Sequence, residues 1–260
     1  MTIRFVDTGY SPGSLNMGID EAVLHAVSEG RSPPTLRFYG WKPECVTVGY
    51  FQSMDDEVDR AACAAAGVDA VRRMTGGGAV YHAEEITYSL VLPEGHVLAP
   101  ADILESYRRI CAGLVAGLGI LGLDASFAPI NDIVLGRGEG ARKVSGNAQT
   151  RKLGCLLQHG TVLLGVEPER MFSLLKVPSE KLKGKLIQDV KARVVGLREA
   201  CGRDIGYDEA AAALREGFSE HWNSSYGLAI AAGSLGEDEW AAGRRAAEAT
   251  YSRSEWNLRR

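Results

Sequence analysis

The sequence predicts an α+β fold in which mixed sheets are flanked by helices. Several short β-rich runs are joined by turns of hairpin length, and other β-rich runs are separated by segments with a helical pattern. This mixture lacks the strict β-α alternation of a doubly wound sheet. A chain of 260 residues, 45% of them hydrophobic, also has enough apolar material to bury a sizeable core.

Strands dominate the first part of the chain. Apolar side chains recur near a period of 3.6 over residues 16–28, which predicts an early helix after a first strand. Two β-rich runs flank the turn residues Gly40 to Pro43, so we expect them to form a hairpin. The elements predicted up to residue 92 are strand 3–6, helix 16–28, strands 35–39 and 45–50, helix 55–66, and strands 68–73 and 86–92.

The second part of the chain turns from strands to helices. A long apolar helix is predicted over residues 100–121, followed by strand-like runs at 124–135, 143–149 and 155–164. Further helices are expected at 168–175, 179–186, 207–222 and 237–251. Because no Pro/Ser-rich linker interrupts the chain, we expect a single catalytic domain over 1–260, with a core at 1–175, a C-terminal helical cap at 176–260 and no separate accessory domain.

Composition and charge exclude several protein classes. The chain has 29 Lys+Arg and 33 Asp+Glu, a net charge of -4, so it lacks the excess of basic residues found in proteins that coat nucleic acids or membranes. No basic segment leads into an apolar stretch at the N-terminus, so no signal peptide is expected. The five cysteines are widely spaced without a CxxC pair, which indicates reduced thiols. We therefore expect a cytoplasmic protein.

A glycine triplet is the most informative segment of the chain. The run from Arg72 to His82 is RRMTGGGAVYH, which follows one predicted strand and precedes another. Glycines leave the backbone free of Cβ atoms, so consecutive N–H groups can converge on an anion, and a nearby arginine can add a charge-assisted contact. A flexible turn between strands is the alternative, and it stays open at this point.

Two residues near the middle of the chain could act on such an anion. Lys143 lies on a predicted strand within RKVSGNAQ, where it could reach a buried acidic ligand or simply be solvated. Asp132, in NDIV, could hold a Mg²⁺ ion that accompanies phosphates, since Mg²⁺ takes only one or two carboxylates, or it could be a turn residue. Considered alone, each residue favours the structural alternative.

Taken together and in order, four segments resemble the lipoate-protein ligase family, which is related to biotin ligases and octanoyltransferases. They are RRMTGGGAVYH, NDIV, ARKVSGNAQ and HGTVLL. The resemblance covers most of the chain, from the opening NMGIDEAVL to the terminal YSRSEWNLRR. It implies the fold of a biotin/lipoyl protein ligase catalytic domain.

The resemblance implies an ATP-dependent lipoate-protein ligase that forms an acyl-adenylate. The carboxylate of lipoic acid attacks the α-phosphorus of MgATP, and the lysine of a lipoyl-carrier protein domain then takes the lipoyl group. Lys143 is the implied catalytic residue, because a fixed ammonium is most effective where negative charge grows in the transition state. We expect a long apolar acyl slot with a polar mouth.

The implied binding residues surround the same motifs. Those expected to bind the nucleotide are Arg73, Gly76, Gly77, Gly78, Ala79, Val80, Tyr81, Asn131 and Lys143. Those expected to bind the lipoyl substrate are Arg73, Gly78, His82, Lys143, Gly146 and His159, and Asp132 is expected to bind Mg²⁺. A purely structural role, capping the loop or bracing the backbone, remains open for His82 and His159.

The sequence departs from the family pattern in two ways. The family commonly has His-Asp after the glycine loop, but Ala83 follows His82 here, so the role of that acid is lost or moved to Glu84 or Glu85. Bacterial ligases of the family also often continue into an accessory domain, and this chain stops near where it would begin. We therefore expect that a separate accessory subunit could be needed.

Two other functions stay open. An octanoyltransferase would move an acyl group between carrier proteins through a cysteine thioester and without ATP. Cys155 is the candidate nucleophile, although a cysteine on a strand is more often a small buried hydrophobe. In octanoyltransferases that resemble this chain the cysteine lies upstream of the lysine strand, where this sequence has FAPIND. A non-catalytic module that binds carrier proteins is the third possibility.

Overall fold

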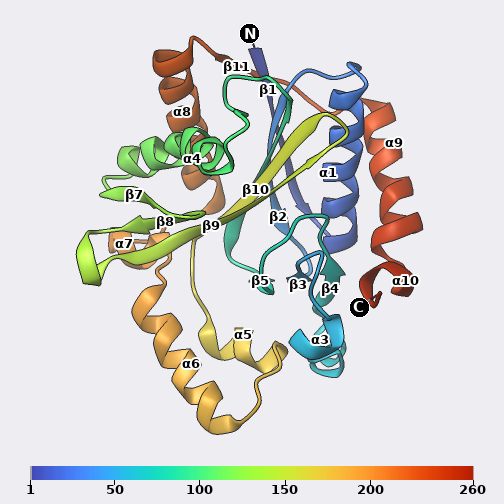
Figure 1. The fold of residues 1–260 in the computed structure, drawn as a ribbon. Helices are drawn as coiled ribbons and strands as arrows, with labels where there is room; N and C mark the ends of the chain where they lie inside the picture. Colours follow the sequence, from blue (N-terminus) through green and yellow to red (C-terminus); the bar gives the residue numbers. More distant parts are fainter. Residues whose placement is uncertain (1, 260) are drawn as a thin grey trace.

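The computed structural model describes residues 2–259, which form two sheets covered by helices (Figure 1). The main sheet has eight strands in the order β11-β1-β2-β6-β10-β9-β8-β7, and the small sheet has the order β4-β3-β5. The strands are β1 (Thr2–Ser11), β2 (Thr35–Trp41), β3 (Cys45–Val48), β4 (Asp69–Arg72), β5 (Val80–His82), β6 (Glu85–Pro93), β7 (Ala125–Ala128), β8 (Asp132–Leu135), β9 (Arg142–Lys152), β10 (Cys155–Leu163) and β11 (Ala229–Ala232).

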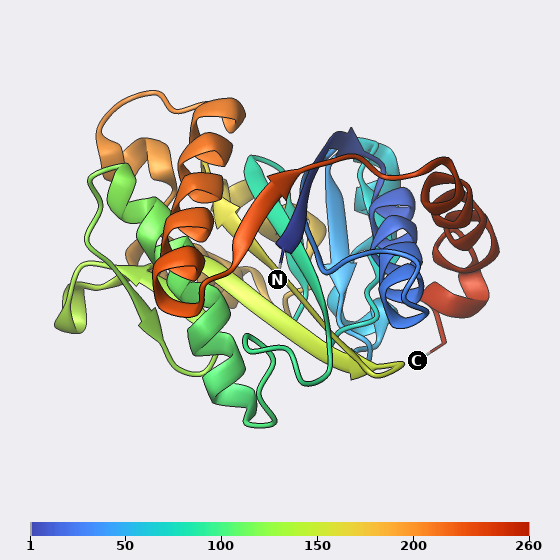
Figure 2. The ribbon, with the colours of Figure 1, turned by 90° about the horizontal axis from the view of Figure 1, so that it is seen from above.

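Helices cover both faces of the main sheet. In the view from above, α1 and α9 lie on one side of the sheet and α4 and α8 on the other (Figure 2). The helices are α1 (Gly13–Ser28), α2 (Met54–Glu57), α3 (Arg60–Ala66), α4 (Ile103–Ile120), α5 (Pro168–Leu174), α6 (Glu180–Arg193), α7 (Leu197–Cys201), α8 (Tyr207–Tyr226), α9 (Glu237–Ala246) and α10 (Ser254–Asn257), with short turns of 3-10 helix at Gly138–Gly140 and π-helix at Ala247–Tyr251.

Each layer of helices has its own apolar core. One core lies between the sheet and the pair α4 and α8, where Leu114 and Phe218 are fully buried. These two helices approach closely because Gly117 of α4 faces Gly217 of α8, and a Cβ on Gly217 would lie 2.0 Å from the amide nitrogen of Gly117. A second core joins α1 and α9 to the opposite face, and a third lies under the small sheet.

The predicted α+β class with mixed sheets and flanking helices is confirmed. The hairpin expected over residues 35–50 is wrong, because the two strands belong to different sheets. β2 pairs with β1 and β6 in the main sheet, whereas β3 pairs with β4 and β5 in the small one. The chain does bend at Lys42 and Pro43, as the sequence predicts, but the two strands on either side of the bend pair with strands from other segments and not with each other.

Other elements also differ from the sequence prediction: strand β1 and helix α6 extend beyond residues 3–6 and 179–186, and the helix expected at 237–251 ends at Ala246. The helix expected at 55–66 is two helices, because Val58 is extended and buried and forms an isolated bridge with Leu175. The strand expected at 124–135 is a β7–β8 hairpin. The C-terminal part also contributes β11, which pairs in parallel with β1 at the sheet edge. Within residues 2–259, no helix combines the length and the apolar character needed to cross a membrane.

Candidate functional site

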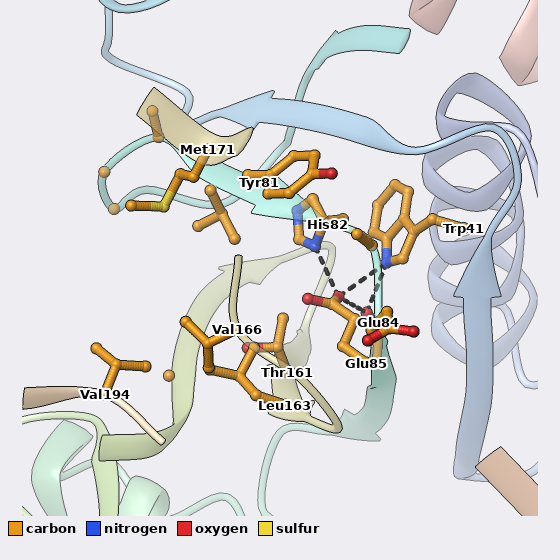
Figure 3. A pocket seen from close by; sticks show the side chains of 18 of the residues that line it. Trp41, Tyr81, His82, Glu84, Glu85, Thr161, Leu163, Val166, Met171 and Val194 are labelled. Carbon is orange, nitrogen blue, oxygen red and sulfur yellow. Dashed lines mark hydrogen bonds and ion pairs between the residues drawn. The ribbon is translucent and has the colours of Figure 1, made fainter. Parts of the chain in front are cut away.

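A cavity of about 360 Å³ lies between the two sheets (Figure 3). Its walls come from the glycine loop between β4 and β5, from β9 and β10, and from the segments next to α5 and α6. The lining residues that bear on its chemistry are Met17, Trp41, Arg73, Gly77, Gly78, Tyr81, His82, Glu85, Asn131, Lys143, Gly146, His159, Leu163, Val166, Met171, Val190 and Val194.

Arg73 holds the glycine loop in place. Its Nη2 donates to the carbonyl oxygens of Gly76 and Gly78, both at 2.9 Å, and its Nη1 donates to the carbonyl and the hydroxyl oxygen of Thr47. Burial lowers the pKa of Arg73 to about 10, which still leaves the guanidinium charged near neutral pH. The loop is therefore shaped by a buried cation that binds its carbonyl groups.

A buried network of polar side chains is connected to the loop through Thr47, which contacts both Arg73 and His82. His82 lies between Thr47 and Glu85, with its Nε2 at 2.7 Å from the hydroxyl oxygen and its Nδ1 at 2.7 Å from the carboxylate. The same Glu85 oxygen accepts from the indole N–H of Trp41, whose ring stacks on His82 at 4.1 Å (Figure 3). Glu85 is thus the acid that pairs with His82, whereas Glu84 forms an ion pair with Arg198.

His159 belongs to a second buried network. Its Nε2 lies 2.7 Å from the hydroxyl oxygen of Thr75, and its Nδ1 lies 3.6 Å from a carboxylate oxygen of Asp20. Burial lowers the pKa of His159, which favours the neutral ring despite the nearby carboxylate. Burial alone would raise the pKa of Asp20, but the interactions with His159 and with the guanidinium of Arg37 hold it below its usual value.

Lys143 provides the accessible positive charge of the cavity wall. Its side chain is 40% exposed, and its Nζ lies 2.7 Å from Oδ1 of Asp132 on the neighbouring strand. The side chain lies across Gly146, where a Cβ would be 2.8 Å from Nζ and 2.9 Å from Cε. The glycine therefore leaves the space through which the ammonium reaches its position.

The rest of the cavity is largely apolar. Met171 and Tyr81 lie along one part of the wall, and Val166, Leu163 and Val194 along another (Figure 3). Such a surface suits a hydrocarbon chain, because burying apolar area is favourable by roughly 25 cal/mol per Å². The cavity therefore combines an apolar slot with an ammonium in its wall.

The structure brings most of the predicted site residues to this one cavity. Those in its wall are Arg73, Gly77, Gly78, Ala79, Val80, Tyr81, His82, Asn131, Lys143, Gly146 and His159. Gly76 and Asp132 are not part of the wall, although each contacts a residue that is. The roles of these residues stay predictions. Residues from distant segments, such as Met17, Trp41, Met171 and Val190, were not predicted, because no local motif marks an apolar wall.

Cys155 does not lie at this site. It pairs with Lys152 at the hairpin end of β9, nine residues from Lys143, which corresponds to about 30 Å along the strand. Its thiol is buried, and burial raises its pKa. None of the five cysteines is among the lining residues. The structure therefore does not support Cys155 as the nucleophile of an acyl transfer.

Comparison with known proteins gives a consistent family. A family model described as the lipoyl protein ligase A/B catalytic domain matches residues 12–219. Octanoyltransferase LipM of Geobacillus kaustophilus is 39% identical, with 99% of this chain and 98% of that protein covered. Octanoyltransferase LipM of Bacillus subtilis is 36% identical, with 100% and 99% covered.

Solved structures of ligases share the fold. The bi-partite lipoate protein ligase of Thermoplasma acidophilum, studied together with its E2 lipoyl domain, superposes with a TM-score of 0.87 at 31% identity and covers 99% of this chain and 96% of that one. A lipoate-protein ligase A bound with ATP gives a TM-score of 0.80 at 29% identity, with 99% of each chain covered.

These relatives correct the expected activity. The curated relatives that match at 34 to 39% identity over their full length are named as octanoyltransferases. An acyl group that is already activated as a thioester can be transferred to an amine without ATP. The expectation of an ATP-dependent lipoate-protein ligase is therefore wrong, and so are ATP, Mg²⁺ and free lipoic acid as its cofactors and substrate. In the structure Asp132 is neutralised by the ammonium of Lys143, and among the described residues no cluster of three or more His, Cys, Asp or Glu could hold a metal ion.

Proposed function

Because the chain belongs to the lipoyl protein ligase A/B catalytic domain family, we propose that it is an octanoyltransferase that works without ATP. It would transfer a medium-chain acyl group from a thioester donor to the lysine of a lipoyl-type carrier domain. The single observation that carries the acyl-transfer part of this proposal is a cavity in which an apolar slot and the Lys143 ammonium occur together, and the independence from ATP rests on the relatives. The naming of the full-length relatives as octanoyltransferases supports it.

In the proposed reaction the carrier lysine attacks the thioester directly. Its neutral ε-amine adds to the carbonyl carbon, the C–N bond forms, the C–S bond breaks, and the thiolate departs with the proton that the amine releases. The position of the cysteines supports direct attack, because all five lie outside the cavity wall. The products are an amide on the carrier and a free thiol.

Lys143 stabilises the oxyanion of the tetrahedral intermediate in this proposal. An ammonium has three N–H donors, and Asp132 accepts from only one direction at 2.7 Å, so others remain for the acyl oxygen. The charge of the ammonium is worth most in a site with little water. Asp132 then acts as a positioning residue that holds Nζ beside the slot, and the glycine loop braced by Arg73 forms another part of the wall.

We propose that the whole chain, with its core at 1–175 and its C-terminal cap, works as one catalytic unit. The archaeal neighbour was studied with an E2 lipoyl domain, which supports a domain of that kind as the acceptor here. The accessory subunit expected from the ligase resemblance belonged to the adenylation reaction and is not part of this proposal.

Acyl transfer can be measured with an octanoyl thioester and a lipoyl-type carrier domain, with and without MgATP. We expect the intact mass of the carrier to increase by one octanoyl group at the same rate in both conditions. Initial rates with both substrates varied should give intersecting double-reciprocal lines, as a ternary complex requires. Cys155→Ser should keep full activity.

Two results would overturn the proposal. Transfer that occurs only with MgATP would exclude a simple transferase. Parallel kinetic lines together with an acyl group on the enzyme itself, located by peptide mass spectrometry, would exclude direct attack and identify the true nucleophile. Binding of the carrier without any transfer would instead favour a non-catalytic module.

A further inference from the structure

Helix α6 has a basic outer face. Residues 180–193 contain five basic and two acidic side chains, a net charge of +3 in a chain whose net charge is -4. Lys181 and Lys185 are exposed and lie one turn apart, so they share one face of the helix. Arg193 is exposed at the C-terminal end. The helix has no buried residue, so its position is not explained by a large apolar contact.

This helix borders the cavity at its charged part. Val190 of α6 and Val194, directly after it, line the cavity. Val194 also forms a parallel bridge with Lys143, and the amide of Val195 donates to the carbonyl oxygen of Lys143 at 2.9 Å. The C-terminal end of α6 is therefore attached to the strand that carries the ammonium. Lys185 and Lys181 lie about 12 and 18 Å farther along the helix than Arg193, a distance that an interface of about 800 Å² per partner can span.

Part of the positive charge of α6 has no partner within the described chain. Lys191 pairs with Glu169 at 2.5 Å, and Lys183 approaches Glu180 at 3.8 Å. Among residues 2–259, Lys181, Lys185 and Arg193 form no ion pair. Like charges one turn apart, as at Lys181 and Lys185, repel each other and slightly destabilise the helix, so folding does not account for them.

We propose that Lys181, Lys185 and Arg193, the α6 basic face, dock an acidic surface of the acceptor carrier domain. This inference rests on the proposed transferase function and adds the chemistry of its partner: carboxylates around the lysine that is to be modified. Charge complementarity carries the argument, since an acidic partner is weakly repelled by a chain with a net negative charge and attracted to a helix with a net charge of +3. The α6 basic face would hold the carrier with its lysine pointing toward Lys143.

The test uses the double variant Lys181→Glu/Lys185→Glu in the full chain. The donor is octanoyl-N-acetylcysteamine, which is small and uncharged, so only the carrier domain can sense the change. We expect KM for the carrier to rise about tenfold at low salt with kcat nearly unchanged, and the difference to shrink as ionic strength increases. Lys181→Arg/Lys185→Arg should restore the wild-type KM.

The matched control is Arg244→Glu/Arg245→Glu, which reverses two exposed charges on α9. In Figure 1 this helix lies on the right and α6 lies at the lower left. The control variant should leave KM unchanged. Equal KM values for wild type and the α6 variant, or an equal effect of the α9 control, would overturn the docking proposal, as would displacement of the carrier by a short RNA duplex at low concentration.

Direct binding separates this proposal from the function on which it rests. Binding of the carrier domain to the chain is measured by titration calorimetry, without any acyl donor. If wild type binds the carrier and the α6 variant does not, the docking proposal stands even if no acyl transfer is found. If transfer occurs but binding and KM are indifferent to α6, only the docking proposal fails. Circular dichroism and thermal unfolding check that each variant is folded.

Discussion

The substitution Gly146→Ala separates the position of the ammonium from the stability of the fold. A Cβ at residue 146 would lie 2.8 Å from Nζ and 2.9 Å from Cε of Lys143, whereas ordinary contacts begin at 3.4 Å. Nζ must therefore move by about 0.6 Å or more to restore ordinary contact. The clash involves the flexible end of a lysine and no backbone atom, so the strand itself need not shift.

We expect this displacement to lower kcat by roughly 10- to 100-fold, because a misplacement near 1 Å can cost about 100-fold in rate. Stability should be unchanged or slightly higher. Gly146 does not have a positive φ, so alanine can adopt its backbone conformation. Replacing a glycine by alanine at such a position stabilises the fold by about 0.4–1 kcal/mol, because alanine reduces the conformational entropy of the unfolded chain. For a chain of this size that corresponds to a Tm change of at most about 4 °C.

Acyl transfer under saturating thioester and thermal unfolding give the two readouts. Gly119→Ala is the control, because a Cβ added at residue 119 would meet no neighbouring atom within 4 Å and its φ is not positive. Its activity should stay at the wild-type value, and its Tm should be unchanged or rise by a few degrees because alanine favours helix α4 over glycine. Full activity of Gly146→Ala would show that the position of Lys143 is not important for turnover. A large drop in Tm would show instead that residue 146 acts through the fold.

The other predictions concern the charges around the cavity. Lys143→Gln should lower kcat by about 100-fold or more with little change in Tm, because it removes the oxyanion-stabilising charge from a half-exposed position; an unchanged kcat contradicts its role. Arg73→Lys should lower both Tm and activity, because one ammonium cannot replace the four hydrogen bonds to Thr47 and the loop carbonyls; a variant as stable as wild type contradicts the bracing role. Burial lowers the pKa of His159, so the unfolded state binds a proton that the native state refuses, and stability should fall as pH drops below about 6.5. The free energy of unfolding, measured with urea between pH 7.5 and 5.5, should fall less steeply with decreasing pH in His159→Gln than in wild type. Equal pH dependence in the two proteins contradicts the role given to His159.

The sequence allowed the site to be predicted where local motifs carry the chemistry. The glycine loop and Lys143 are far apart in the chain, yet both occur in the wall of one cavity, as their joint resemblance implied. Trp41 and Met171 could not be predicted, because a wall of apolar side chains has no local pattern. The predicted pairing of β2 with β3 was also wrong, because turn residues indicate that the chain changes direction but do not indicate which strand each neighbouring strand pairs with.

The activity was predicted wrongly for a chemical reason. The attack of an amine on an acyl-adenylate and its attack on a thioester both develop negative charge on the oxygen of the acyl carbonyl, so both benefit from an ammonium beside an apolar slot. The motif around Lys143 therefore does not separate the two reactions. Identity over the full length of the relatives does, because it includes the walls and surfaces that receive the donor and the acceptor.

The hydrogen bonds of Arg73 explain why the proposed mechanism assigns the oxyanion to Lys143 and not to this arginine. Four N–H groups of Arg73 donate to Thr47 and to the carbonyl groups of the loop, so this cation stabilises the wall. His82 is held between Thr47 and Glu85, and the pKa of His159 is lowered by burial. Lys143, with 40% of its side chain exposed, is thus the lining cation that can follow a developing oxyanion. A Cβ at Gly146 would lie 2.8 Å from Nζ of Lys143, so the proposed mechanism predicts that this residue, which has no functional group, affects the reaction rate.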